Sequence, residues 1–216
     1  FLDITTTVNL ASASFAHTGF GSDWLDFDND GDLDLFVANG AVQRYVRANG
    51  QVAPDYAQKN QLWRNDGKRF TNVSDIAFDN ELGAATSRGA AFGDIDNDGD
   101  TDIVVTNKDG PARLYINQTA AGQWLGLELR GVRSNRDAIG AIVKLDLPDG
   151  RQIRRVVRRD GSYQSAHDPR VIIGLGALTA VPDVEISWPA GGRQRLENLT
   201  LRRFHVVVEA DNITRP

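Results

Sequence analysis

The chain has 216 residues, no cysteine and a formal net charge of −5. Its length allows one or two domains, and the lack of cysteine excludes a disulfide scaffold and a cysteine-ligated zinc or iron–sulfur site. No apolar run approaches the ~18 residues that a membrane helix needs, so we expect no membrane span.

The N-terminal residues 1–18 contain the segment Phe1–Val8, whose residues favour β structure. We expect an edge strand here, or an extension that docks elsewhere. The chain begins with Phe1 and contains no methionine. This suggests a processed or trimmed product from which any signal peptide has been removed.

Two acidic stretches, residues 26–34 and 94–102, share the pattern Asp-x-Asp-Asn-Asp-Gly-Asp-x-Asp and lie 68 positions apart. Five carboxylates in such a short stretch repel one another unless they are hydrated or neutralised. Calcium accepts six to eight oxygen ligands in irregular geometry, and glycine at position 6 supplies the sharp turn around the ion. A solvated acidic loop is the alternative, but the fixed glycine and the repetition favour two calcium sites. The candidate ligands are Asp26, Asp28, Asp30, Asp32, Asp34, Asp94, Asp96, Asp98, Asp100 and Asp102.

An EF-hand is excluded because it requires glutamate at position 12, where this chain has Val37 and Val105. The residues after each acidic stretch, Leu33–Ala38 and Ile103–Thr106, are apolar and rich in β-branched types, which predicts buried strands. Strand-flanked loops indicate structural calcium. Weak calcium sites fill at the ~mM calcium of the extracellular space, so we expect a secreted or cell-surface protein.

Residues 19–123 contain two copies of a longer unit. Asn60–Phe70 predicts a hairpin with its turn at 65–67, and Arg113–Asn117 matches Gln61–Asn65. An insertion at Ala41–Gln58 accounts for the greater length of the first copy. A repeated unit of several strands is typical of propeller blades.

Residues 124–216 read as a small antiparallel β-sandwich or sheet. Strands are expected at Leu125–Arg130, Ala141–Leu147, Val184–Trp188 and Phe204–Val208. The chain is thus predicted to be all-β, with partial β-propeller-like blades followed by this domain. We expect the four tryptophans, which lie within strand patterns, to be core residues. They are Trp24, Trp63, Trp124 and Trp188.

The segment from Phe92-Gly93-Asp94 through Gly99 to Gly110-Pro111 resembles an FG-GAP (VCBS-type) repeat, the calcium-binding blade of integrin α-subunit propellers. The first copy departs from this pattern, with Trp24-Leu25 in place of Phe-Gly. The resemblance implies that side chains at positions 1, 3, 5 and 9 and the backbone carbonyl at position 7 bind the ion. The implied ligands are Asp26, Asp28, Asp30, Asp34 and the Asp32 carbonyl, and Asp94, Asp96, Asp98, Asp102 and the Asp100 carbonyl.

The C-terminal part resembles an ASPIC/UnbV domain in several motifs. They are Gly131–Ala141, Gly161–Ser165, Asp168–Arg170, Gly174–Gly176 and Trp188-Pro189. The order of the two resemblances places the chain close to the cartilage acidic protein 1 group.

Ser162, Ser165, His167 and Asp168 are the residue types of a hydrolytic triad. No Gly-x-Ser-x-Gly elbow is present, and the same residues suit hydrogen-bonded turns and an Asp168–Arg170 clasp. We therefore expect that this chain is not an enzyme. A hydrolase or biosynthetic enzyme is the last alternative.

Charge is distributed unevenly, with 9 Lys/Arg against 18 Asp/Glu in residues 1–123 and 15 against 11 in residues 124–216. The second half includes a basic cluster at Arg151, Arg154, Arg155, Arg158 and Arg159. No nucleic-acid-binding motif accompanies this cluster, and the chain is acidic, so nucleic acid is not an expected partner.

The unequal halves predict head-to-tail self-association into rings or filaments, with Phe1–Val8 added to a neighbour by β-strand addition. The expected function is a secreted calcium-binding structural or adhesion protein that forms a homo-oligomer or polymer. The alternative is a monomeric module that binds an extracellular protein or glycan.

Overall fold

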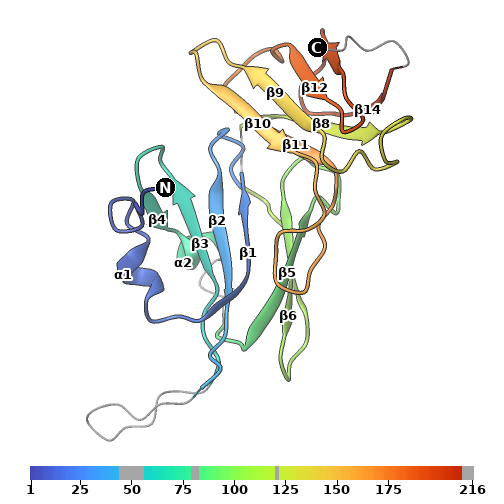
Figure 1. The fold of residues 1–216 in the computed structure, drawn as a ribbon. Coiled ribbons are helices and arrows are strands. Elements are labelled where there is room, and N and C mark those ends of the chain that lie inside the picture. Colours follow the sequence, from blue (N-terminus) through green and yellow to red (C-terminus); the bar gives the residue numbers. More distant parts are fainter. Residues whose placement is uncertain (44–55, 79–82, 120–121, 211–216) are drawn as a thin grey trace, which may run out of the picture.

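The structure is a computed structural model that describes residues 1–43, 56–78, 83–119 and 122–210. Strands dominate these residues and form four sheets. Two sheets lie in the repeat region and two in the C-terminal domain, which sits across one end of the repeats (Figure 1). None of the helices in the described residues is long and apolar enough to cross a membrane.

The first repeat is a four-stranded antiparallel sheet, here called blade 1. Its strands, in spatial order, are β1 (Gly19–Leu25), β2 (Asp34–Asn39), β3 (Gln61–Asn65) and β4 (Phe70–Asn72). The predicted hairpin is present as β3 and β4, and Gly67 in its turn has φ 76°. Of the predicted insertion, residues 44–55 lie outside the described residues.

The second repeat, blade 2, has three antiparallel strands. They are β5 (Ser87–Gly93), β6 (Asp102–Asn107) and β7 (Arg113–Tyr115). The ends of β5 and β6 lie 68 residues after those of β1 and β2, and the pairing is irregular between Ser87 and Ala90 as it is between Gly19 and Ser22. The two copies therefore share backbone irregularities as well as strands.

The two blades pack through one apolar core contributed by both. Phe36 of β2 meets Phe92 of β5 edge-on, with ring centroids 5.8 Å apart. Strands β1 and β5 approach closely at Gly21, where any Cβ would collide with the backbone of Ala90. Only glycine fits such an approach without moving the backbone.

Residues 1–18 contain no strand. The Asp3 side chain accepts hydrogen bonds from the backbone and hydroxyl of Thr5, and this local bonding turns the chain despite its β propensity. A short helix, α1 (Ala11–Ser14), follows. The extension docks on blade 1, because Phe70 N–H donates to the Val8 carbonyl at 2.9 Å. A second short helix, α2 (Ser74–Ala77), follows β4.

The C-terminal domain is a sandwich of two sheets around one core. One sheet has the order β10-β9-β12-β13 and the other the order β11-β8-β14. Their strands are β8 (Gln123–Arg130), β9 (Ile142–Asp146), β10 (Gln152–Val156), β11 (Val171–Gly176), β12 (Val184–Ser187), β13 (Arg193–Leu196) and β14 (Phe204–Val208).

One pair of strands departs from the predicted antiparallel arrangement, since β14 runs parallel to β8. The connection after β13 returns the chain to the start of β8, where Gly126 N–H donates to the Arg203 carbonyl at 3.1 Å. A crossover of this kind delivers a strand in parallel orientation.

Trp63, Trp124 and Trp188 are buried as predicted, but Trp24 is 47% exposed. Its neighbours Asp23 and Leu25 are buried, so alternation along β1 turns Trp24 to the opposite face. There it packs on Phe70 at 5.7 Å between ring centroids. The pattern of alternation, and not residue type, decided the position of this side chain.

Candidate metal centres

The two acidic stretches join the first two strands of each blade and adopt the same backbone turn. We call residues 26–34 loop 1 and residues 94–102 loop 2. In loop 1 Asn29 and Gly31 have φ of 54° and 96°, and in loop 2 Asn97 and Gly99 have φ of 64° and 94°. Asparagine and glycine tolerate this left-handed region. The turn predicted at position 6 is present, and position 4 shares the left-handed conformation.

Three carboxylates of each loop, at positions 1, 3 and 9, lie together. Each contributes an oxygen, and the oxygens of one group lie within 4.8 Å of one another. Such spacing suits a single cation with ligands at ~2.3–2.6 Å. The residues brought together are Asp26, Asp28 and Asp34 in loop 1, and Asp94, Asp96 and Asp102 in loop 2.

The four other predicted side chains lie outside these two groups. At position 5, Asp30 and Asp98 accept the backbone N–H of the residue two further on, at 2.8 and 3.0 Å. At position 7, Asp32 pairs with Arg151 at 3.2 Å, and Asp100 accepts a hydrogen bond from the loop 1 residue Asn29.

The carboxylate at position 9 ties each loop to the end of the third strand of its blade, or to the residues just after it. Asp34 accepts the N–H of Asn65 at 2.8 Å, and Asp102 accepts the N–H of Asn117 at 2.8 Å. These asparagines were missed as site residues in the sequence. The signal was available, because both end the matched segments Gln61–Asn65 and Arg113–Asn117.

Buried carboxylates make loop 1 electrostatically unfavourable without a cation. Burial raises the pKa of Asp26 to about 7, although Arg155 opposes this, and burial raises the pKa of Asp34 to about 8. Asp26 is only 6% exposed. Its Oδ1 and the Oδ1 of Asp28 are buried and find no hydrogen-bond partner among the described residues.

A cation between these oxygens would supply the missing partner and favour the ionised carboxylates. In loop 2, burial raises the pKa of Asp94, and burial with the nearby Asp98 raises that of Asp100 to about 6. The donors gathered in both groups are oxygens, which suits a hard cation such as calcium. The residues present therefore fit the predicted ion.

Family comparisons agree with this organisation. The FG-GAP-like repeat family matches residues 26–105, the FG-GAP repeat family matches residues 88–123, and the ASPIC and UnbV family matches residues 131–214. The chain is an FG-GAP repeat protein with a C-terminal ASPIC/UnbV domain. No curated protein matches it. Its placement near the cartilage acidic protein 1 group stays a prediction.

The ASPIC/UnbV domain packs directly on loop 1. Gly174 of β11 lies so close to Asp26 and Asn29 that a Cβ there would collide with both residues. The Asn29 carbonyl accepts the N–H of Gly176 at 2.9 Å, and the Asp28 carbonyl accepts the N–H of Gly122 at 3.1 Å. Loop 1 is thus held by the backbone of the C-terminal part.

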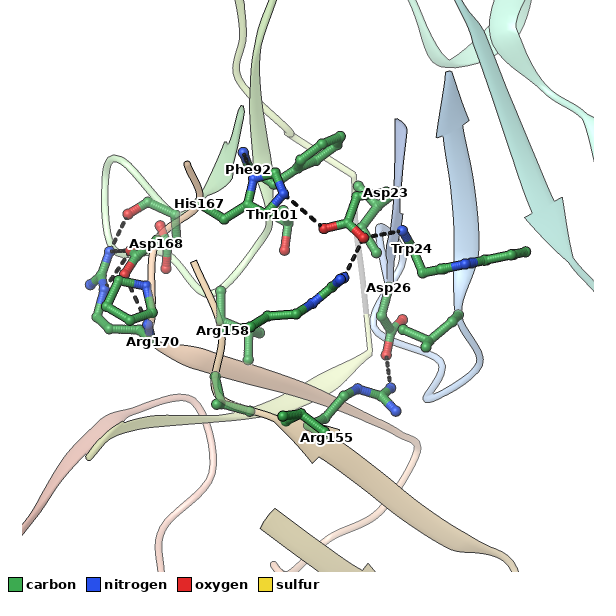
Figure 2. A pocket seen from close by; sticks show the side chains of 18 of the residues that line it. Asp23, Trp24, Asp26, Phe92, Thr101, Arg155, Arg158, His167, Asp168 and Arg170 are labelled. Carbon is green, nitrogen blue, oxygen red and sulfur yellow. Dashed lines mark hydrogen bonds and ion pairs between the residues drawn. The ribbon is translucent and has the colours of Figure 1, made fainter. Parts of the chain in front are cut away.

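Arg155 and Arg158, two arginines of the predicted basic cluster, bind acids of the first repeat of this same chain. Arg155 Nη2 lies 3.2 Å from the Gly31 carbonyl and 3.9 Å from Asp26 Oδ2. Arg158 pairs with Asp23 of β1. Figure 2 shows both arginines reaching from the ASPIC/UnbV domain toward the carboxylates of blade 1. These two arginines therefore partly neutralise the first repeat from within the chain.

Arg170 holds loop 2 in a comparable way. It donates to the Asn97 side chain at 2.6 Å and to the Asp94 carbonyl, and its Nε donates to Asp168 at 2.7 Å. Its guanidinium also lies over the Phe204 ring, 4.5 Å from the centroid. The predicted Asp168–Arg170 clasp is present, and Arg170 also reaches loop 2, which the sequence did not reveal.

A cavity of about 610 Å³ lies between the two blades and the segment from β10 to β11, and His167, a residue of the possible triad, lines it (Figure 2). His167 Nδ1 accepts the N–H of Phe92 at 3.3 Å, and its Nε2 lies 3.2 Å from Asp23 Oδ2. Ser162 Oγ accepts the N–H of Ser22 at 3.0 Å, and Ser165 donates to the Tyr163 carbonyl. The Ser162 bond joins the C-terminal domain to blade 1, and the Ser165 bond closes a local turn. In the described part of the chain, neither serine is hydrogen-bonded to His167.

Proposed function

We propose that this chain is an extracellular, non-enzymatic calcium-binding structural protein, with one calcium ion in each FG-GAP loop. The observation that carries the proposal is the buried Asp26 carboxylate, which lies beside Asp28 and Asp34 and whose Oδ1 has no hydrogen-bond partner in the part of the chain that the structure describes. Each ion would stiffen a loop on which the ASPIC/UnbV domain rests. FG-GAP repeats occur in extracellular and surface proteins, where ~mM calcium fills weak sites.

Calcium titration by calorimetry, combined with thermal unfolding, tests this proposal. We expect two ions per chain and a lower melting temperature in EGTA. A ligand that binds only the folded state at 100 times its Kd stabilises that state by about 2.7 kcal/mol. Asp26→Asn should abolish binding in loop 1, and Asp94→Asn binding in loop 2.

Asp109→Asn is the matched control, because Asp109 is an exposed acid of blade 2 outside both loops. It should bind calcium as the wild type does. The proposal is wrong if calcium produces no heat of binding and chelation leaves the melting temperature unchanged.

Self-association is the second part of the proposal. The chain has two blades, whereas closed propellers have about four to eight. At the edge of the sheet β11-β8-β14, strand β14 exposes Val206 and Val208, each at 52%. An exposed apolar edge favours β-strand addition. We infer that copies associate through such edges, and not through Arg151, Arg155 and Arg158, which bind acids within the chain. A monomeric module for an extracellular protein or glycan is the alternative.

A further inference from the structure

Asn29, at position 4 of loop 1, links the two calcium loops to each other. Its side chain is almost completely buried, and the residue is 1% exposed. The Nδ2 group donates to Asp100 Oδ1 at 2.6 Å and to the Gly99 carbonyl at 3.3 Å. Both acceptors belong to loop 2, so one amide group spans the gap between the two candidate metal centres.

The backbone of Asn29 meets the ASPIC/UnbV domain at the same point. Its carbonyl accepts the Gly176 N–H, and Gly174 fits against it only because glycine has no Cβ. The other face of Gly99 is covered by the Trp124 ring, with no space for a Cβ. Loop 1, loop 2 and the C-terminal domain are therefore in contact around Asn29.

The equivalent residue of loop 2 does not make such a link. Asn97 has the same left-handed backbone conformation, but it is exposed and its Oδ1 accepts a hydrogen bond from Arg170. The repeat thus supplies two asparagines in one local geometry with different partners. Both asparagines can support the conformation of their own loop, but only the Asn29 side chain joins the two loops. Comparing variants of the two residues therefore distinguishes these roles.

We propose that Asn29 is a positioning residue that makes the two calcium sites fill cooperatively; this inference rests on the proposed function. Asn29 follows Asp28, a candidate ligand of the first ion. It bonds to Asp100, whose carbonyl is an expected ligand of the second. An ion in either loop fixes one end of this link. The other loop then loses less conformational freedom when it binds its own ion, which gives positive cooperativity.

The test is calcium binding by the whole chain, measured by titration calorimetry in calcium-free buffer. In the wild type the second ion should bind at least about 5-fold more tightly than the first, the lower end of typical coupling. Asn29→Gly removes the amide and keeps a residue that tolerates positive φ. It should still bind two ions, but with a Hill coefficient near one. Asn97→Gly, the matched control, should keep the wild-type coefficient.

Substitution at Asp100 separates the link from the loop itself. Asp100→Ala removes the acceptor side chain and should reproduce the loss of cooperativity seen in Asn29→Gly. Asp100→Asn keeps an acceptor oxygen for Asn29 and should retain cooperativity. A purely structural role would lower the melting temperature in all of these variants without changing the Hill coefficient selectively.

Two ions that bind independently to the wild type overturn this inference and leave the proposed function standing. Equal loss of cooperativity in Asn29→Gly and Asn97→Gly also overturns it. Absence of calcium binding in the wild type overturns the proposed function and the inference with it.

Discussion

Glu209 shows how one residue holds the end of the ASPIC/UnbV domain. It follows β14 and is only 2% exposed. Its Oε2 accepts the N–H groups of Val132, Arg133 and Ser134 at 2.9, 2.8 and 2.7 Å, and its Oε1 accepts the Ser134 hydroxyl. Burial alone would raise the pKa of Glu209, but these donors outweigh burial and lower the pKa below its ordinary value.

Replacement of this carboxylate gives a prediction with a defined pH dependence. The pKa of Glu209 is lower in the folded chain, so its contribution to stability is present above the ordinary pKa of 4.5 and is lost as the pH falls through the folded value. Glu209→Gln removes the negative charge and replaces one of the two acceptor oxygens with an amide donor, which should cost about 2 kcal/mol at neutral pH. Urea unfolding from pH 3 to 7 measures this difference, which should narrow toward acid pH.

Glu128→Gln is the matched control, since Glu128 lies on β8 in an exposed pair with Arg130 at 2.8 Å. Exposed ion pairs contribute ~0–1 kcal/mol. A loss of stability equal to that of Glu209→Gln would contradict the role assigned to the buried carboxylate.

At the scale of elements, the contact between β1 and β5 decides how the blades fit together. Gly21 of β1 lies against the backbone of Arg88 and Ala90, which cannot move aside as a flexible side chain does. The shared core around Phe36 and Phe92 lies between these blades. Close approach of two backbones is therefore a condition for burying that core.

Gly21→Ala should force β1 and β5 apart and lower the free energy of unfolding by about 1–3 kcal/mol, as overpacking does in other proteins. Gly110→Ala is the control, because a Cβ there makes only an ordinary contact with Asn107 at 3.6 Å. Denaturant unfolding compares the two variants. If Gly21→Ala is as stable as Gly110→Ala, the close approach does not limit the packing of the blades.

At the scale of the whole molecule, the ASPIC/UnbV domain covers loops 1 and 2, as its position at one end of the blades in Figure 1 indicates. The segment after β10 extends this contact along the repeats. There Tyr163 packs on Phe20 at 5.1 Å, and Asp168 N–H donates to the Phe92 carbonyl at 3.0 Å. The three modules thus share polar as well as apolar contacts.

Self-association is tested on the intact protein by light scattering in ~mM calcium, the extracellular range, and in EGTA. We expect particles larger than a monomer in calcium. Lysine on an edge strand discourages strand addition, so Val206→Lys with Val208→Lys should reduce their size. Val132→Lys is the control, because Val132 is exposed in a loop of the same domain. A monodisperse monomer in calcium favours the monomeric binding module.

Sequence alone determined the features that depend on local backbone chemistry. The paired turns at Gly31 and Gly99 follow from residue type, and the strands after them follow from short apolar runs, which in β6 are β-branched. Local bonding also decided between the two expectations for the N-terminus, an edge strand or a docked extension, in favour of the extension. The hydrogen bond from Thr5 N–H to the Asp3 side chain turns a segment whose β propensity predicts a strand. Residue propensities do not include this competition between side-chain hydrogen bonds and strand pairing.

Tertiary structure alone decided which distant residues complete each candidate site. Asn29 and Asp100 are 71 positions apart, and Arg170 and Asn97 are 73 apart. These pairs meet because the apolar cores of the blades and of the sandwich fix the orientation of the modules. The same packing pairs Arg155 and Arg158 with acids of blade 1, where charge composition had predicted a contact between chains. Composition gives the number of charges in each half of the chain but not their partners. The partners are set by the burial of apolar surface, which is not directional. No residue spacing in the sequence therefore predicts which charges meet.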